Sequence, residues 1–273
     1  MIKGTLNKLD VEFSDPVVYR LVMGEASLTL NDYLGRTLSI NFSGEIYCTA
    51  CGRRTKTSFS QGFCFPCCQK LAQCDLCIVR PETCHFEQGT CREPEWGMTH
   101  CMQPHYVYLA NSSGLKVGIT RQTQIPQRWI DQGAQQALTI FKVQTRFQSG
   151  LLEACIAKHV MDKTDWRKML KGDAPALDLV AERDRLTDQL ANDLGDLRSR
   201  FGELAIATLP DSKTVTIRYP LLNYPSAIKA LNLEKTPQIS GKLLGIKGQY
   251  LLFDSGVLNI RKYTGYGVEV WGD

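Results

Sequence analysis

Ten of the eleven cysteines lie between Cys48 and Cys101, and their spacing is that of metal ligands. The first four form two CxxC pairs, "CTAC" (Cys48 and Cys51) and "CFPC" (Cys64 and Cys67), with twelve residues between the pairs. Each pair makes a tight turn that points two thiolates at one ion, and four thiolates complete a tetrahedron around zinc. An all-cysteine site leaves no open coordination position, so we predict a structural zinc rather than a catalytic one.

A second group of cysteines follows directly, beginning with "CDLC" at Cys74 and Cys77. Two further ligands would complete another tetrahedral site. Cys84 and Cys91 are the nearest in sequence, and Cys101 or His85 are alternatives to them. The pattern therefore predicts a second structural zinc whose last two ligands the spacing leaves open.

The loop between the first two CxxC pairs carries cations next to an aromatic ring. Arg53, Arg54 and Lys56 precede Phe59. Cations of this kind bind phosphate, and an aromatic ring stacks on a nucleobase. The loop is a candidate nucleic-acid contact, and the alternative is a solvated turn.

Composition divides the chain into five segments. Residues 48–104 are rich in Cys, Gly and Pro and poor in apolar residues, so they need metal to fold. Residues 1–47 and 205–273 contain short strand-like runs separated by Gly, Asn and Asp, and their matching character suggests that they pair into one split β domain. Residues 105–171 read as strand, turn, strand, helix, strand, and a last helix from about Leu151 to Val160. Residues 172–204 form an amphipathic helix, interrupted near Gly195. The fold class is α+β.

The totals are those of an ordinary globular protein. The 273 residues suggest about two domains, and 43% hydrophobic and 22% charged residues favour a packed core over disorder. No apolar run approaches the ~20 residues of a membrane span, and the N-terminus "MIKGTLNKLDVEFSD" lacks an apolar signal core. We therefore expect a cytoplasmic protein, in which clustered thiols serve as metal ligands rather than disulfides.

The stretch "HYVYLANSSGLKVGITR", from His105 to Arg121, contains further candidate chemistry. Its two strand-like halves carry "YVY", which ends at Tyr108, and "KVG", which begins at Lys116. Arg128 follows in "PQRWIDQGA" and Glu153 in "SGLLEACIAKHV". This order resembles the GIY-YIG nuclease superfamily over residues 105–171, with Lys116 in place of the second tyrosine.

The resemblance implies roles for these residues in phosphodiester hydrolysis. Tyr108 would orient or deprotonate water, Arg128 would neutralise phosphate charge, and Glu153 would bind Mg²⁺. Lys116 is a further catalytic candidate, although a lysine is a poorer base unless burial lowers its pKa. Residues 105–171 hold ten Lys and Arg against four Asp and Glu, which favours an anionic partner.

Nearly the full chain also resembles a bacterial, cysteine-rich family known as a domain of unknown function. The resemblance rests on "CDLCIVRPETCHFEQGTCREPEWG", "HYVYLANSSGLKVGITR", "RWIDQGA" and "GIKGQYLLFDSGVLNIRKYTGY". It implies a family but no activity.

We expect a two-zinc protein that binds DNA or structured RNA. The expected phosphate contacts are Arg53, Arg54, Lys56, Lys116, Arg121 and Arg128. Two alternatives remain: an active Mg²⁺-dependent endonuclease, and a zinc-stabilised protein–protein adaptor that uses the β-rich ends as its docking surface. The mild net charge of +4 permits a nucleic-acid partner without requiring one.

Overall fold

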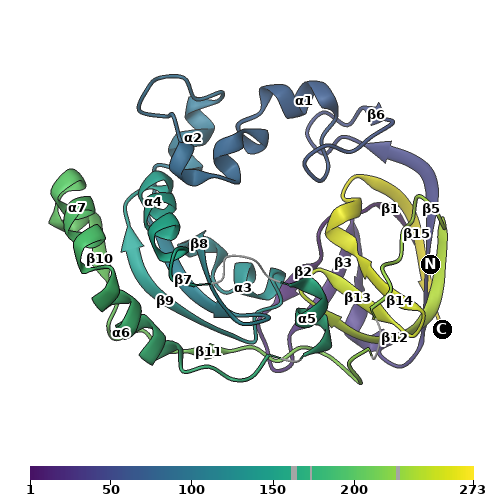
Figure 1. Cartoon of the computed structure of the whole chain (residues 1–273). Helices are drawn as coiled ribbons and strands as arrows, with labels where there is room; N and C mark the ends of the chain where they lie inside the picture. The colour runs from purple at the N-terminus through teal and green to yellow at the C-terminus, as the bar shows by residue number, and fades with distance from the viewer. Residues whose placement is uncertain (161–164, 173, 226–227) are drawn as a thin grey trace.

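The computed structural model of the chain describes residues 1–160, 165–172, 174–225 and 228–273. Its ribbon has three parts arranged as an open ring (Figure 1). A β-rich part contains both chain ends, an α/β part contains the middle of the chain, and the cysteine-rich segment runs between them across the top of the view. The fold is mixed α and β, with several antiparallel sheets.

The two ends of the chain form one seven-stranded antiparallel sheet. Its strands, in spatial order, are β1 (Ile2–Thr5), β15 (Tyr266–Gly272), β5 (Thr37–Tyr47), β12 (Gln238–Lys247), β13 (Tyr250–Phe253) and β14 (Gly256–Asn259), and β6 (Arg54–Thr55) pairs with β5. The N-terminal strands β1 and β5 lie on either side of the C-terminal β15. Neither end could therefore complete this sheet alone.

A smaller antiparallel sheet packs against the same core. It contains β2 (Asp10–Glu12), β3 (Val18–Met23) and β4 (Ala26–Thr29). In β3 every second side chain (Tyr19, Leu21, Met23) is buried, as expected for a strand with one face on a core. The amide group of Asn31 accepts from the Tyr19 N–H and donates to the Val17 carbonyl, and so satisfies backbone groups that lie past the end of β4.

The α/β part is built on a five-stranded antiparallel sheet. Its strands are β7 (His105–Asn111), β8 (Leu115–Arg121), β9 (Gln136–Val143), β10 (Ile206–Thr208) and β11 (Val215–Thr216), and its helices are α3 (Gln127–Asp131), α4 (Arg146–Ile156), α6 (Leu179–Gln189) and α7 (Ala191–Phe201). Helices α4, α6 and α7 share an apolar core with one face of the sheet. The other face contributes Tyr108 and Ala110 to the core of the β-rich part.

Two helix boundaries differ from the sequence prediction. The amphipathic stretch breaks at Leu190, between α6 and α7, whereas Gly195 lies inside α7. An exposed glycine is tolerated within a helix at a modest cost, so Gly195 was the wrong place for the break. Helix α4 begins at Arg146 rather than near Leu151, because Thr145 and Gln148 form a reciprocal capping box.

The cysteine-rich segment has little regular structure and little apolar burial. It contains α1 (Phe65–Lys70), α2 (Pro94–His100) and three 3₁₀ turns, η2 (Ala72–Cys74), η3 (Leu76–Ile78) and η4 (Pro81–Thr83). Its buried apolar side chains are three cysteines, Ala72 and Pro81. Such a segment cannot offset its conformational entropy by apolar burial alone, which agrees with a metal-dependent fold.

The remaining elements complete the junctions. Helix α5 (Trp166–Lys171) packs on the β-rich part, where the ring of Trp166 stacks on that of Tyr250 at a centroid distance of 5.8 Å. The other short 3₁₀ turns are η1 (Leu30–Tyr33), η5 (Gln122–Gln124), η6 (Glu203–Ala205) and η7 (Ile260–Tyr263). No helix in the described ranges is long and apolar enough to cross a membrane.

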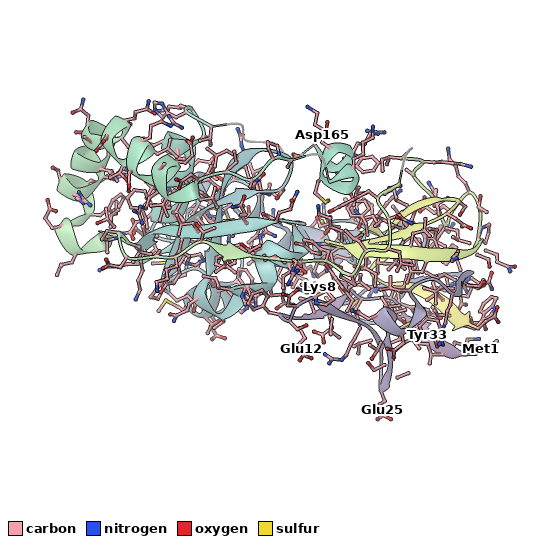
Figure 2. All side chains as sticks on the ribbon, turned by 90° about the horizontal axis from the view of Figure 1, so that it is seen from below. Met1, Lys8, Glu12, Glu25, Tyr33 and Asp165 are labelled. Carbon is pink, nitrogen blue, oxygen red and sulfur yellow. The ribbon has the colours of Figure 1, made fainter. Side chains whose placement is uncertain are left out.

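A buried polar cluster fixes the two larger parts to each other. The side chain of Gln249 accepts from the Leu9 N–H (2.7 Å) and donates to the Leu9 carbonyl and to Asp131 Oδ1 (2.8 Å). Asp131 lies at the end of α3, and its Oδ2 forms an ion pair with Lys8 Nζ at 3.0 Å. Lys8 lies where the β-rich and α/β parts meet (Figure 2). The relative position of the two parts is therefore set by directional bonds as well as by shared apolar packing.

Candidate metal centre and basic cleft

The first four cysteines converge on one point, each held by a different local structure. Cys48 follows β5, Cys51 lies in the next turn, Cys64 is the N-cap of α1, and Cys67 lies in the first turn of α1. The turn closes through the Gly52 N–H, which donates to the Cys48 carbonyl, and Gly52 has a φ of +70°. A glycine adopts that left-handed conformation without steric cost.

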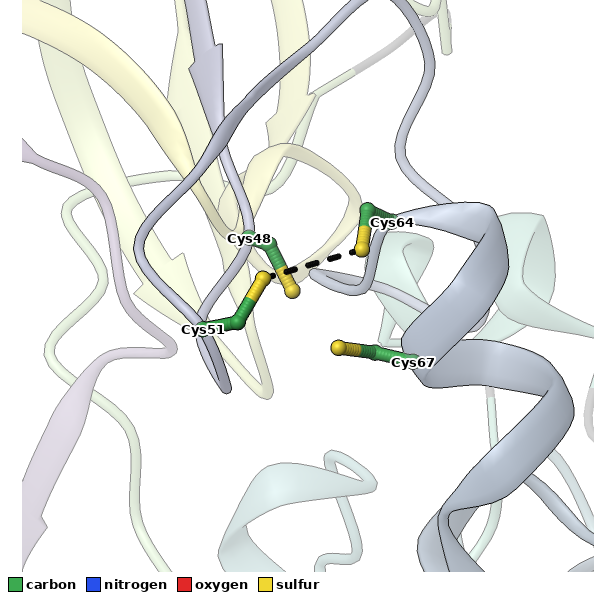
Figure 3. Close-up of side chains that lie close together, drawn as sticks. All are labelled: Cys48, Cys51, Cys64 and Cys67. Atoms are coloured by element: carbon green, nitrogen blue, oxygen red, sulfur yellow. Dashed lines mark hydrogen bonds between the residues drawn. The ribbon is translucent and has the colours of Figure 1, made fainter.

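The spacing of these thiols fits a single tetrahedral ion. All four sulfurs lie within 4.8 Å of one another, and Cys51 Sγ and Cys64 Sγ are 3.8 Å apart (Figure 3). Ligands at the usual zinc–sulfur distance of 2.3 Å stand about 3.8 Å apart in a tetrahedron. The cluster is thus compatible with a structural metal such as zinc.

The electrostatics of the cluster favour metal binding. Burial pushes the pKa of Cys48 up, but hydrogen bonds from the backbone amides of Cys64, Cys51 and Ala50 outweigh it and lower the pKa to about 6. A hydrogen bond with Cys64 and then burial raise the pKa of Cys67 to about 12. Without metal the Cys48 thiolate therefore forms readily, whereas Cys67 holds its proton. A divalent cation would displace that proton and relieve the crowding of the sulfurs.

The later cysteines divide into two places. Burial and then the nearby Cys68 thiol raise the pKa of Cys74 to about 11, and the Cys68 sulfur lies 3.4 Å from Ser60 Oγ. Cys77 instead lies with Asp75 and His85, and ligand atoms of these three are within 4.8 Å of one another. The two members of "CDLC" thus face different neighbours, although the sequence spacing pairs them.

A cleft of about 1200 Å³ separates the cysteine-rich segment from the other two parts. Its basic lining residues are Lys8, Arg92, Arg121, Arg146 and Arg261, and its one acidic lining residue is Asp75. Lys8 is paired with Asp131 and Arg92 with Asp75. Among the described residues, no acidic side chain forms an ion pair with the other three arginines.

Flat and apolar side chains line the same cleft. They are Phe63, Leu76, Ile78, Val79 and Trp96. Leu76 and Val79 are exposed, at 56% and 76%. The Trp96 ring stacks on that of His100, with centroids 4.1 Å apart and an interplanar angle of 10°. The cleft therefore combines positive charge with surfaces on which a planar base can lie.

The three residues of the nuclease resemblance lie near one another. Tyr108 is fully buried and its hydroxyl donates to Gln132 Oε1 at 2.9 Å. Burial raises the pKa of Tyr108 to about 12. The positive charge of Arg128 lowers this pKa, and the negative charge of Glu153 raises it further. Arg128 and Glu153 also act on Arg146, whose pKa is lowered mainly by burial. The group thus adjoins the cleft through Arg146.

The other predicted phosphate contacts are distributed differently. Arg121 lines the cleft. The loop between the first two CxxC pairs exposes Arg53, Arg54 and Lys56 to solvent. There Arg54 forms an ion pair with Glu45 at 3.4 Å. Lys116 on β8 is only 8% exposed. Of these positions, Arg121 is the one that the structure places in the cleft lining.

The β-rich ends of the chain supply residues to the cleft lining that the sequence analysis did not predict. Lys8 and Arg261 are separated by most of the chain, yet both line the cleft. No local motif marks either residue, because their proximity arises from the pairing of β1 with β15. The one sequence prediction that bears on this proximity is that the two ends of the chain form one β domain.

Residues 35–268 match the family described as "Protein of unknown function (DUF2797)", and the chain belongs to that family. The comparison with curated proteins gave no match, and the comparison with solved structures gave none either.

Proposed function

We propose that this protein binds nucleic acid in the cleft between its cysteine-rich segment and its two larger parts. The observation that carries the proposal is the lining of the cleft by Arg121, Arg146 and Arg261, which form no ion pair with the described acidic residues, next to Trp96. Guanidinium groups bind phosphates, and an aromatic surface stacks on bases regardless of their identity. The zinc-type cluster would shape one wall of the cleft.

Binding can be measured by fluorescence anisotropy with labelled single-stranded and duplex DNA and RNA of the same sequence. We expect binding that weakens steeply with salt, because each phosphate contact releases counterions. A protein that binds none of these ligands at low salt would instead agree with the adaptor alternative.

A second function, phosphodiester cleavage, is favoured by the proximity of Tyr108, Arg128 and Glu153. Glu153 would supply a carboxylate to Mg²⁺, and Arg128 would offset charge on the phosphate. A buried tyrosine with a pKa of about 12 is a poor base near pH 7, so Tyr108 would position groups rather than remove a proton.

The test is cleavage of plasmid DNA and structured RNA with Mg²⁺ or Mn²⁺. Wild-type protein should cut, and Glu153→Gln should lose at least tenfold in rate while binding as before. Equal cleavage by both proteins would assign the activity to a contaminant or another site. Binding without cleavage would leave the first proposal standing and remove the second.

A further inference from the structure

Four of the later cysteines form a group distinct from the zinc-type cluster. Cys77, Cys84, Cys91 and Cys101 are separated by six, six and nine residues. Turn η3, which carries Cys77, contacts turn η4, which ends directly before Cys84. Arg146 donates hydrogen bonds to the carbonyls of Ile78 and Cys101, so Cys77 and Cys101 lie on either side of it. Cys91 Sγ lies against Gly97 of α2, the helix that ends directly before Cys101. The four cysteines therefore lie in one region of the cysteine-rich segment.

The local structure explains how these positions meet. The Cys101 N–H donates to the Gly97 carbonyl at the end of α2. A side chain at Gly97 would come within 3.4 Å of Cys91 Sγ and within 2.8 Å of the Phe86 ring, so this turn of α2 lies directly on the loop that carries Cys91. Turn η4, which precedes Cys84, packs on α4, where a side chain at Gly150 would meet Pro81 at 2.5 Å.

The spacing within this group differs from that around a single ion. No three of these four sulfurs, all within the described ranges, lie within 4.8 Å of one another, whereas the four sulfurs of the first cluster do. In the first cluster, Cys51 Sγ and Cys64 Sγ lie 3.8 Å apart. Ligands of one zinc stand about 3.8 Å apart, so this group is too wide for one.

Arginine chemistry supplies an independent indication of an anionic centre here. The Arg146 side chain donates through Nη2 to the Ile78 carbonyl at 2.6 Å. The backbone N–H of Arg146 donates to the Cys101 carbonyl at 2.8 Å. Its Nε is buried and has no hydrogen-bond partner among the described residues. The guanidinium also interacts with the charges of Cys101 and Cys77. A buried donor of this kind fits a negatively charged sulfur or thiolate.

We propose that Cys77, Cys84, Cys91 and Cys101 hold an iron–sulfur cluster. In such a cluster the cysteine thiolates bind several iron atoms rather than one common ion, so their sulfurs stand farther apart than around zinc. Arg146 offsets part of the cluster's negative charge and donates Nε–H to one of its sulfurs. Cys101 and Arg146 also line the cleft, so the cluster lies in its wall.

The trio Asp75, Cys77 and His85 is a weaker candidate for the same region. The Asp75 carboxylate is already paired with Arg92 Nε at 2.7 Å, and His85 Nε2 lies 3.4 Å from that carboxylate. His85 Nδ1 is within 2.8 Å of Thr90 Oγ1. These contacts use the groups that a metal would need, and Asp75 then serves as a neighbour that orients His85 and Arg92.

The test is metal and sulfide analysis of the full-length protein, purified without oxygen and then incubated with ferric iron, sulfide and a thiol reductant, so that the iron source supplies the ferric ions that the cluster contains. We expect one zinc, together with iron and acid-labile sulfide in equal amounts, a visible charge-transfer absorption and a paramagnetic signal after reduction. Two zinc ions per chain without iron and sulfide after this treatment would overturn the proposal.

Alanine variants assign the ligands. Cys101→Ala and Cys84→Ala should lose iron and sulfide at least tenfold and keep one zinc, and the retained zinc shows that the chain still folds. Cys74→Ala is the matched control, because the thiol that acts on Cys74 is that of Cys68, which is outside this group. It should retain the cluster, and loss of iron and sulfide from Cys74→Ala equal to that from Cys101→Ala would contradict the assignment.

Discussion

The Tyr108 hydroxyl donates a hydrogen bond to Gln132 Oε1 across 2.9 Å, and this bond joins the central strand β7 to the end of helix α3. Gln132 lies four residues after Arg128, so both side chains lie on the same side of the helix. The bond therefore positions the part of α3 that carries Arg128. Tyr108 is a structural support for this cation, whatever chemistry the neighbouring groups perform.

Replacing Tyr108 by Phe should preserve binding and reduce stability. The ring remains in the core against Trp129, whose ring centroid lies 6.0 Å away, while Gln132 loses its donor. We expect the free energy of unfolding to fall by about 1 kcal/mol and nucleic-acid affinity to change less than threefold. Urea denaturation and anisotropy test this. A tenfold loss of affinity at unchanged stability would show that the hydroxyl contacts the ligand.

Replacing Gln249 by Ala should loosen the junction between the two larger parts. The change leaves the Leu9 N–H and carbonyl and Asp131 Oδ1 without their buried partner. We expect a loss of roughly 3 kcal/mol in urea denaturation. The control is Lys3→Ala, which removes an exposed ion pair with Glu269 in the β-rich part and should cost less than about 1 kcal/mol. Equal losses of unfolding free energy in the two variants would argue against a buried polar cluster that joins the two parts.

Lys247 predicts an unusual dependence of stability on pH. Its ammonium is fully buried near the rings of Tyr219 and Tyr224, and burial lowers its pKa to about 8 from the usual 10.5. Between those pH values the unfolded chain holds a proton that the folded chain has lost. The free energy of unfolding should therefore rise with pH across this window.

The Lys247→Met variant isolates that effect. At pH 7 it should be more stable than wild type by about 2 kcal/mol, since it removes a charge from the core but also removes the contacts with the tyrosine rings. By pH 10 the difference should largely disappear. Urea denaturation at both pH values measures it, and a difference that is independent of pH would mean that Lys247 does not titrate in this range.

Removing one ligand of the first metal centre should release its zinc and destabilise the loop between the first two CxxC pairs. We expect Cys67→Ser to lose one zinc per chain and to unfold about 10 °C lower, with faster tryptic cleavage near Arg53. Cys68→Ser is the neighbouring control, because Cys68 is outside the four-cysteine group. Zinc content by mass spectrometry and thermal unfolding provide the comparison. Zinc retained by Cys67→Ser would contradict the assignment.

The sequence predicted those features that depend on local spacing. The CxxC pairs place four sulfurs together because each pair needs only a tight turn. The strands of residues 105–121 were also visible, since apolar residues dominate both and a Gly-containing turn separates them. Thr145 followed three residues later by Gln148 is the sequence pattern of a capping box, and this pattern predicts the start of α4 at Arg146.

Features that depend on contacts between distant residues were not readable in the same way. Lys8 and Arg261 meet at the cleft through strand pairing of the two chain ends. Cys74 and Cys77 belong to one CxxC motif, yet Cys74 turns toward Cys68 and Cys77 toward Asp75. Short 3₁₀ turns on either side of Asp75 separate the two thiols, and no periodic pattern in the sequence indicates this.

The most direct test of nucleic-acid binding in the cleft is the salt dependence of affinity for a labelled single-stranded oligonucleotide. We would compare wild type with the double variant Arg121→Gln, Arg261→Gln, and use Arg185→Gln on α6 as a control outside the cleft lining. The double variant should bind at least tenfold more weakly, and its slope of log affinity against log salt should be shallower by about 1.4. The control should match wild type. Identical slopes for all three proteins, or no binding by wild type at low salt, would contradict the account.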